Sequence, residues 1–421
     1  MRYTISYQRL EQIKGVRLSR EETEAEYEID ENRIFSMKKS LRVLALGNKI
    51  NVSRSGQKAP NFKELRFLRL GGDISGLWPV NLESLERLAV FHGPVFKDGV
   101  TLYRLPKRLR VMNATAQSQE SANLQESMPA NIIKNSSLEE LDLEELKTLQ
   151  RLPERLDHLT ALKVMILDEW DKMQEVPEQV CELRSLCKLS ICGGISLKNL
   201  PNSFGQLSCL EELILTSRKQ LEGLPPTFGG LSSLKHLNLA ECVNLKELPS
   251  SFGKLRSLQI LNLESCWKLE ALPSSFGQLC QLKRLSLRSE DLKELPSSFG
   301  ELSSLAELRC NCLELKELPV SFGQLSSLTH LDLSCCMKLK TLPSSIGELR
   351  SLKDSNLSAC FKLEKLPSNI GELPCLTQLD LRQCHSLRKC PISILRQRNQ
   401  GLTIWLPDHL KERESTSSKQ R

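Results

Sequence analysis

The sequence has few aromatic residues, no long apolar run and no strong excess of one charge. Phe, Trp and Tyr make up 5% of the 421 residues, which favours a repetitive aliphatic core. A membrane helix needs about 18 consecutive apolar residues, and none are present. The start of the chain also lacks an apolar signal core. The net charge of +7 is too small for a nucleic-acid-binding stripe. We therefore expect no membrane and no nucleic-acid partner.

Motifs for catalysis and for cofactor binding are also missing. The sequence contains no GxxxxGK[ST], HExxH, GxSxG, GxGxxG or CxxC pattern. We therefore predict that the protein is not an enzyme and that it binds no cofactor or metal. A zinc site remains open as an alternative, with Cys310, Cys312, Cys335 and Cys336 as ligands in successive turns. The 15 cysteines, an odd number without a signal peptide, indicate reduced thiols in the cytosol or the nucleus.

A period of 24 residues is the most specific feature present. Leu-Pro pairs recur at intervals of 24 residues, or twice 23, with prolines at 153, 177, 201, 225, 249, 273, 296, 319, 343, 367 and 391. The unit around each proline reads LxxLxLxxCxxLxxLPxxFGxL, which matches the leucine-rich-repeat pattern. We predict an α/β solenoid, a leucine-rich-repeat horseshoe of about 15 repeats. Its parallel sheet lies on the concave face, and short helical or irregular segments form the convex side.

Each repeat explains its own local structure. In LxxLxL the last two leucines alternate with polar residues, which predicts a short strand with the leucines turned inward. The other positions of the unit form the crossover that parallel pairing requires. The proline fixes φ and directs the chain onto the convex side.

Two further columns of residues should stack through the array. After the strand, a small buried thiol can donate to carbonyls of the turn, at Cys242, Cys266, Cys336, Cys360 and Cys384. On the convex side, phenylalanines should form a spine, each followed by a glycine that permits a tight backbone bend. This spine comprises Phe204, Phe228, Phe252, Phe276, Phe299 and Phe322, followed by Ile346 and Ile370.

Ser355 occupies a position where neighbouring repeats carry an inward leucine or methionine. An unpaired hydroxyl there would cost about 1–3 kcal/mol. We therefore predict that Ser355→Leu raises the melting temperature.

The repeats are irregular before residue 138. Residues 40–46, 65–70, 85–90 and 109–112 each resemble the strand pattern, but they are spaced irregularly. We divide the chain into an N-terminal cap (1–40), irregular repeats (41–137), regular repeats of 23–24 residues (138–400), and a last strand with a disordered tail (401–421). The cap contains one strand candidate at residues 13–18.

The residues that flank the inward leucines should form the binding surface on the concave sheet. They change from acidic near residue 140, through a mixed centre, to a basic step at Arg284, Arg288 and Arg309, with isoleucines between. Charged steps beside apolar patches suit protein recognition, whereas the alternative is a merely solvated sheet. The candidate protein-binding residues are Glu140, Asp142, Glu144, Ile166, Glu212, Ile214, His236, Asn238, Ile260, Asn262, Arg284, Arg288, Arg309, His330, Asp332, Asn356 and Asp380.

The chain resembles the C-terminal repeat region of plant nucleotide-binding disease-resistance receptors. The motifs that carry the resemblance are SLRVLAL at residues 40–46, IKGVRL at residues 13–18, and the repeat unit over residues 138–395. The resemblance implies that the array senses a pathogen effector or a modified host protein and restrains a nucleotide-binding module. This chain lacks such a module, so it could be a fragment, a truncated product or a decoy.

Two other functions remain open. One is a free-standing intracellular scaffold similar to Ras-group leucine-rich-repeat proteins, which would assemble signalling complexes. The other is a substrate-recruiting subunit of a ubiquitin ligase, although the N-terminus shows no F-box-like helix segment. The sequence does not name the ligand or the oligomeric state.

Overall fold

The computed structural model describes residues 15–18, 27–30, 42–46, 50–53, 64–71, 84–91, 108–115, 136–144, 152, 156, 158–170, 173–194, 196–398 and 401–411. The chain divides into two units, which are described separately. Unit 1 comprises residues 1–173 and 179–194, and unit 2 comprises residues 174–178 and 195–421.

Unit 1 contains a series of parallel strands that begins with the irregular repeats. The predicted strands pair in the expected order, and Val43, Phe67, Arg87, Val111 and Glu140 are successive partners across it. The uneven spacing of the early repeats therefore lies in their crossovers and leaves the strand register intact. The strands of this series are β1 (Gly15–Leu18), β3 (Val43–Leu46), β5 (Phe67–Gly71), β6 (Arg87–Phe91), β7 (Val111–Thr115), β8 (Glu140–Asp142), β9 (Val164–Ile166) and β10 (Lys188–Ser190).

The N-terminal part holds one element that the sequence analysis did not predict. The strands β2 (Tyr27–Asp30) and β4 (Ile50–Ser53) pair in parallel as a separate two-stranded sheet. Strand β2 lies within the acidic segment that follows β1, where alternating charge hides the strand pattern. The predicted strand at residues 13–18 is confirmed as β1, which pairs with β3. Most of the proposed cap lies outside the described residues.

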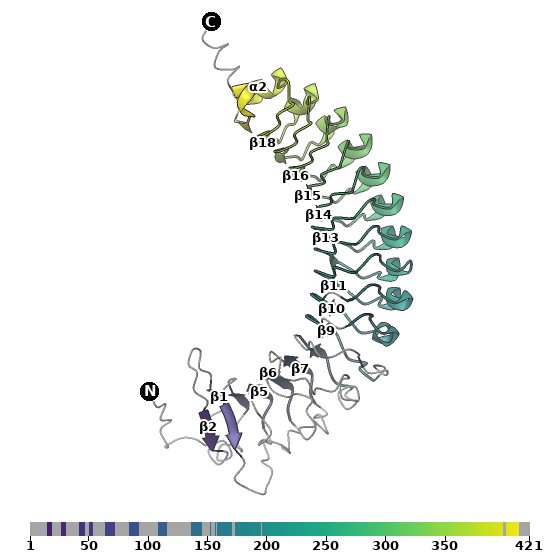
Figure 1. Ribbon diagram of the computed structural model, residues 1–421, viewed down its shortest axis with the longest axis vertical. Helices are drawn as coiled ribbons and strands as arrows, with labels where there is room; N and C mark the ends of the chain where they lie inside the picture. The colour runs from purple at the N-terminus through teal and green to yellow at the C-terminus, as the bar shows by residue number, and fades with distance from the viewer. Residues whose placement is uncertain are drawn as a thin grey trace. The chain divides into compact units, whose positions relative to one another are not determined.

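Unit 2 contains the regular repeats. Its strands are parallel neighbours in sequence order and line the inner side of a curved array (Figure 1). The predicted last strand is confirmed as β19, which pairs with β18. The strands are β11 (Glu212–Ile214), β12 (His236–Asn238), β13 (Ile260–Leu263), β14 (Arg284–Leu287), β15 (Glu307–Cys310), β16 (His330–Asp332), β17 (Asp354–Asn356), β18 (Gln378–Asp380) and β19 (Thr403–Trp405).

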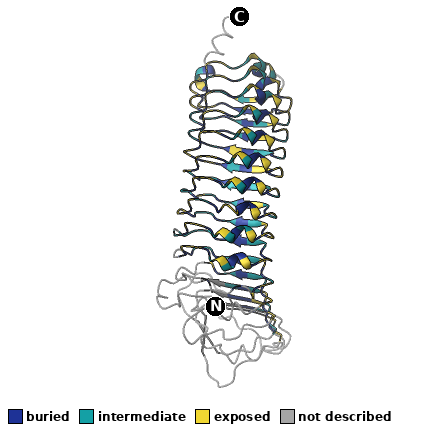
Figure 2. Cartoon of the chain, turned by 90° about the vertical axis from the view of Figure 1, so that its right-hand side faces the viewer, coloured by how far each residue is buried: buried dark blue, intermediate teal, exposed yellow. Residues whose placement is uncertain are grey.

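Short 3-10 helices form the outer side of this array (Figures 1 and 2). In most repeats the proline precedes the helix with an extended backbone, as at Pro249 with φ −66° and ψ 153°. Its carbonyl accepts the amide of the buried Phe, as Pro249 does from Phe252 at 2.9 Å. The helices are η3 (Glu178–Glu182), η4 (Asn202–Gln206), η5 (Phe228–Gly230), η6 (Ser250–Lys254), η7 (Ser274–Gln278), η8 (Ser297–Glu301), η9 (Val320–Gln324), η10 (Ser344–Glu348) and η11 (Ser368–Glu372), and α2 (Ile392–Arg398) follows them.

The predicted phenylalanine spine is confirmed. Consecutive rings from Phe204 to Phe322 are fully buried and nearly parallel, with centroids 6.0–6.2 Å apart. Ile346 and Ile370 continue the column and are 1% exposed.

The role predicted for the glycines beside this spine was wrong. Their φ angles are not positive, so no tight bend requires them. Instead, a Cβ at Gly253 or Gly277 would overlap the carbonyl oxygen of Ser275 or Ser298 in the next repeat. Glycine is needed because adjacent coils approach so closely.

The thiol column is also confirmed. Cys242, Cys266, Cys336, Cys360 and Cys384 each donate to a carbonyl of the preceding repeat over 3.0–3.2 Å. In unit 1 the indole of Trp170 makes the equivalent bond, at 2.7 Å to the Leu143 carbonyl. In a 23-residue repeat Ser289 does so, with its hydroxyl donating to Trp267 and Leu269. A buried donor is thus retained where the residue type changes.

Candidate functional site

The register of the strands in unit 2 aligns the candidate side chains into two columns. Residues before the central inward position form the first column, and residues after it form the second. The first column reads Glu212, His236, Ile260, Arg284, Glu307, His330, Asp354, Gln378 and Thr403. The second reads Ile214, Asn238, Asn262, Ser286, Arg309, Asp332, Asn356, Asp380 and Trp405. Neighbouring members of a column lie about 4.8 Å apart.

Most predicted residues are accessible on this face. In unit 2 the predicted set is exposed or half-buried, with the exception of Asp380, which is 8% exposed. In unit 1, Glu140, Asp142 and Ile166 are half-buried, and Glu144 is exposed. Asp380 lies beneath the guanidinium of Arg382 and is therefore less accessible than the sequence analysis expected.

Several second-column side chains also have a structural task. The side-chain oxygens of Asn238, Asn262, Asp332, Asn356 and Asp380 accept the backbone amide two residues later, at 2.9–3.1 Å. Each turn then continues into a left-handed residue, such as Ala359 with φ 58°. These side chains shape the turn, so only part of each is available to a partner.

The predicted basic step is partly neutralised. Arg284 lies 3.2 Å from Glu307, and the guanidinium of Arg288 stacks 4.8 Å above the ring of Trp267. Arg309 is exposed and forms no ion pair with any described residue. Arg309 is therefore the member of the step best able to meet an anionic group of a partner.

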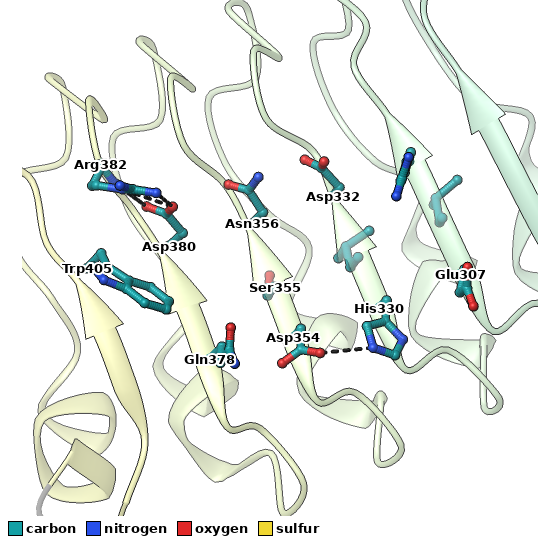
Figure 3. A pocket seen from close by; sticks show the side chains of 13 residues that line it. Glu307, His330, Asp332, Asp354, Ser355, Asn356, Gln378, Asp380, Arg382 and Trp405 are labelled. Carbon is teal, nitrogen blue, oxygen red and sulfur yellow. Dashed lines mark hydrogen bonds and ion pairs between the residues drawn. The ribbon is translucent and has the colours of Figure 1, made fainter. Parts of the chain in front are cut away.

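The concave face of unit 2 contains a hollow of about 520 Å³ over β15–β19 (Figure 3). His330 Nε2 lies 3.0 Å from Asp354 Oδ2 on one side of it. On the other side, Arg382 donates through Nε to both oxygens of Asp380 at 3.0 Å and lies 5.8 Å from the ring of Trp405. Polar and aromatic side chains that line the hollow are Glu307, Arg309, His330, Asp332, Asp354, Asn356, Gln378, Asp380, Arg382 and Trp405.

Sequence reasoning missed Trp405 as part of this surface. The segment at residues 400–406 was identified only as a last strand, and its place in the second column depends on pairing with β18. The alternation of polar and apolar residues in GLTIWL could have indicated an outward tryptophan. Trp405 is 37% exposed.

In unit 1, Asp142 lies in a partly buried polar cluster. It accepts from the Asn113 side chain at 2.9 Å and from the Glu144 amide at 3.1 Å. Burial raises the pKa of this carboxyl above its usual range, against the opposing effect of these hydrogen bonds. The predicted acidic end therefore contains a carboxylate that is costly to bury.

The possible zinc ligands do not form a site. Among the described residues no group of three or more Cys, His, Asp or Glu is placed to hold a metal ion. The Cys310 and Cys312 sulfurs lie 3.8 Å apart, whereas the Cys336 thiol donates to the Cys310 carbonyl at 3.0 Å. Burial and the neighbouring Cys312 raise the pKa of the Cys310 thiol, which disfavours the thiolate that zinc requires.

Comparisons with known proteins identify the repeats. Residues 225–314 and 277–364 match the family model of the leucine-rich repeat region. This part of the chain is a leucine-rich repeat region. No curated protein sequence matches the chain. Within the described segments, no helix is both long and apolar enough for a membrane span.

Solved leucine-rich-repeat structures are similar to the chain. A leucine-rich-repeat protein of Leptospira interrogans has 24% identity and a TM-score of 0.57, with 90% of this chain and 100% of that chain covered. The leucine-rich repeat domain of the type III effector XopL has 30% identity and a TM-score of 0.44, over 58% and 76%. The Toll–Spätzle complex of Drosophila has 17% identity and a TM-score of 0.54, over 83% and 52%. The first and third likenesses support the fold: a leucine-rich-repeat solenoid of about 15 repeats.

Proposed function

We propose that this protein is a non-catalytic recognition module that binds another protein through its concave sheet. The single observation that carries the proposal is the pair of aligned columns in unit 2. Their exposed charges and half-buried isoleucines are held on a rigid sheet whose leucines are fully committed to the core. Rigid presentation lowers the entropy cost of binding.

Within this module class, we assign the chain to the recognition part of a plant disease-resistance receptor. It would sense a pathogen effector or a modified host protein, or contact a nucleotide-binding module. The support is the SLRVLAL entry strand and the repeat unit, together with the use of this fold by the Toll–Spätzle complex, described as a hub in development and innate immunity. All 15 cysteines are free thiols, which supports a reducing compartment, cytosolic or nuclear.

Capture of partners from infected plant tissue tests the proposal. The variant Arg284→Glu with Arg309→Glu reverses two concave charges and should abolish capture of the partner that the unaltered protein retains. The matched control, Arg256→Glu with Arg350→Glu, makes the same charge change at exposed positions outside the columns and should leave capture intact.

Equal loss in both variants, or in neither, would contradict recognition by the concave face. Capture of the same partners from infected and uninfected tissue would instead favour the free-standing signalling scaffold. Proximity labelling in the two tissues provides an independent measurement of that difference.

A further inference from the structure

The hollow over β15–β19 contains a polar group that has no use in the fold. Ser355 lines the hollow, is 4% exposed, and its hydroxyl forms no hydrogen bond within the described residues. Its register partners are the buried leucines Leu331 and Leu379. A buried hydroxyl without a partner is unfavourable, which suggests that a bound group satisfies it.

The charges around Ser355 determine which group this is. The side chains that line the hollow include four carboxylates and two arginines, which leaves an excess of two negative charges with His330 neutral. Asp380 is already compensated by Arg382, and Glu307 by Arg284. Asp332 accepts only from the neutral Asn311 side chain and the Ser334 amide. Asp332 and Asp354 are therefore the carboxylates that can take a further cation.

The register places these two carboxylates around one point. Asp354 and Asn356 flank Ser355 on β17, and Asp332 is the neighbour of Asn356 on β16. A cation above β17 would have Asp332 about 4.8 Å to one side, one strand away. The ring of Trp405 closes the end of the hollow beyond β18 (Figure 3) and offers an aromatic face.

We propose that this hollow receives an arginine side chain of the protein partner. Asp332 and Asp354 accept its N–H groups from two strands, and the Ser355 hydroxyl accepts another at the floor. A planar guanidinium suits this arrangement because its five donors diverge in a fixed fork. The inference rests on the proposed recognition by the concave face and names the chemistry of the partner there.

Fluorescence anisotropy with a labelled glycine peptide that carries two arginines tests this assignment. The same peptide with citrulline at both positions keeps the shape and removes the charge, and it should bind about tenfold more weakly or not at all. Equal binding of the two peptides, or no binding of the arginine peptide, would overturn the proposal.

Variants of the full chain localise the site. Asp332→Asn with Asp354→Asn should weaken the arginine peptide by about tenfold. The control Glu212→Gln with Glu264→Gln removes two carboxylates from the same face outside the hollow and should change affinity by less than about twofold. Equal weakening in both variants would indicate unspecific attraction and sink the assignment.

Ser355→Leu separates binding from folding. It should raise the melting temperature, because it removes a buried unpaired hydroxyl, and weaken the peptide by roughly threefold. A gain in stability with unchanged affinity would remove Ser355 from the site. If the arginine peptide fails while the Arg284/Arg309 variant still loses its partner, the hollow is wrong and recognition by the concave face stands.

Discussion

At the scale of single residues, one side-chain atom often decides whether a position serves the fold or a partner. The second-column Asn and Asp residues look like binding residues in the sequence, yet one oxygen of each closes a turn. The thiols of the buried column are similarly committed, since each donates to a carbonyl that no strand satisfies. Polar groups on a repeat protein must therefore be assigned atom by atom.

Cysteine reactivity should follow this division. Burial raises the pKa of the Cys384 thiol to about 12, so at about pH 8 the folded protein holds it protonated and unreactive. The exposed Cys209, Cys280 and Cys375 should alkylate with iodoacetamide, while Cys384 should react only after unfolding in urea. Peptide mass spectrometry measures the difference, and rapid labelling of Cys384 in the folded state would contradict the buried column.

At the scale of elements, the close approach of successive coils sets the strictest steric condition. The 3-10 helices stack so tightly that the glycine after each buried Phe has no room for a side chain. The 23-residue repeats show a second accommodation: β14 and β15 extend by one residue, and the left-handed position of the turn is absent there.

Gly277→Ala should therefore destabilise the protein by about 1–3 kcal/mol, because the backbone must shift away from Ser298. Gly223→Ala is the matched control, since a Cβ there meets no atom within 4 Å and φ is not positive. It should be neutral or slightly stabilising. Urea unfolding measures both variants, and similar midpoints would show that the coils can separate at little cost.

At the scale of the whole molecule, stability should be a sum of repeats and of their nearest-neighbour contacts. Strand pairing within each unit joins only sequential repeats. A defect should consequently spread to adjacent coils and fade beyond them.

Leu261→Ala tests this expectation. Leu261 is 1% exposed in β13, and its truncation should cost about 2–5 kcal/mol. Hydrogen exchange followed by mass spectrometry should show the greatest loss of amide protection in β12–β14, with little change in β17 and β18. Uniform loss along the described strands would mean that the molecule unfolds as one cooperative body.

The sequence by itself determined the strands, their register, the phenylalanine spine and the thiol column. Each of these recurs at a fixed covalent spacing, so one repeat predicts the next, even where the early intervals vary from 20 to 29 residues. The N-terminal β2–β4 pair escaped prediction because it has no repeating partner.

Only the tertiary structure decided how adjacent coils meet. The overlap that imposes glycine, the burial of Asp380 beneath Arg382, and the alignment of Trp405 with Asp380 all depend on distances between repeats. The hollow around Ser355 has the same origin, since its walls come from five strands more than twenty residues apart in sequence. A periodic pattern fixes what each coil contributes, whereas the spacing and twist between coils fix which contributions come together.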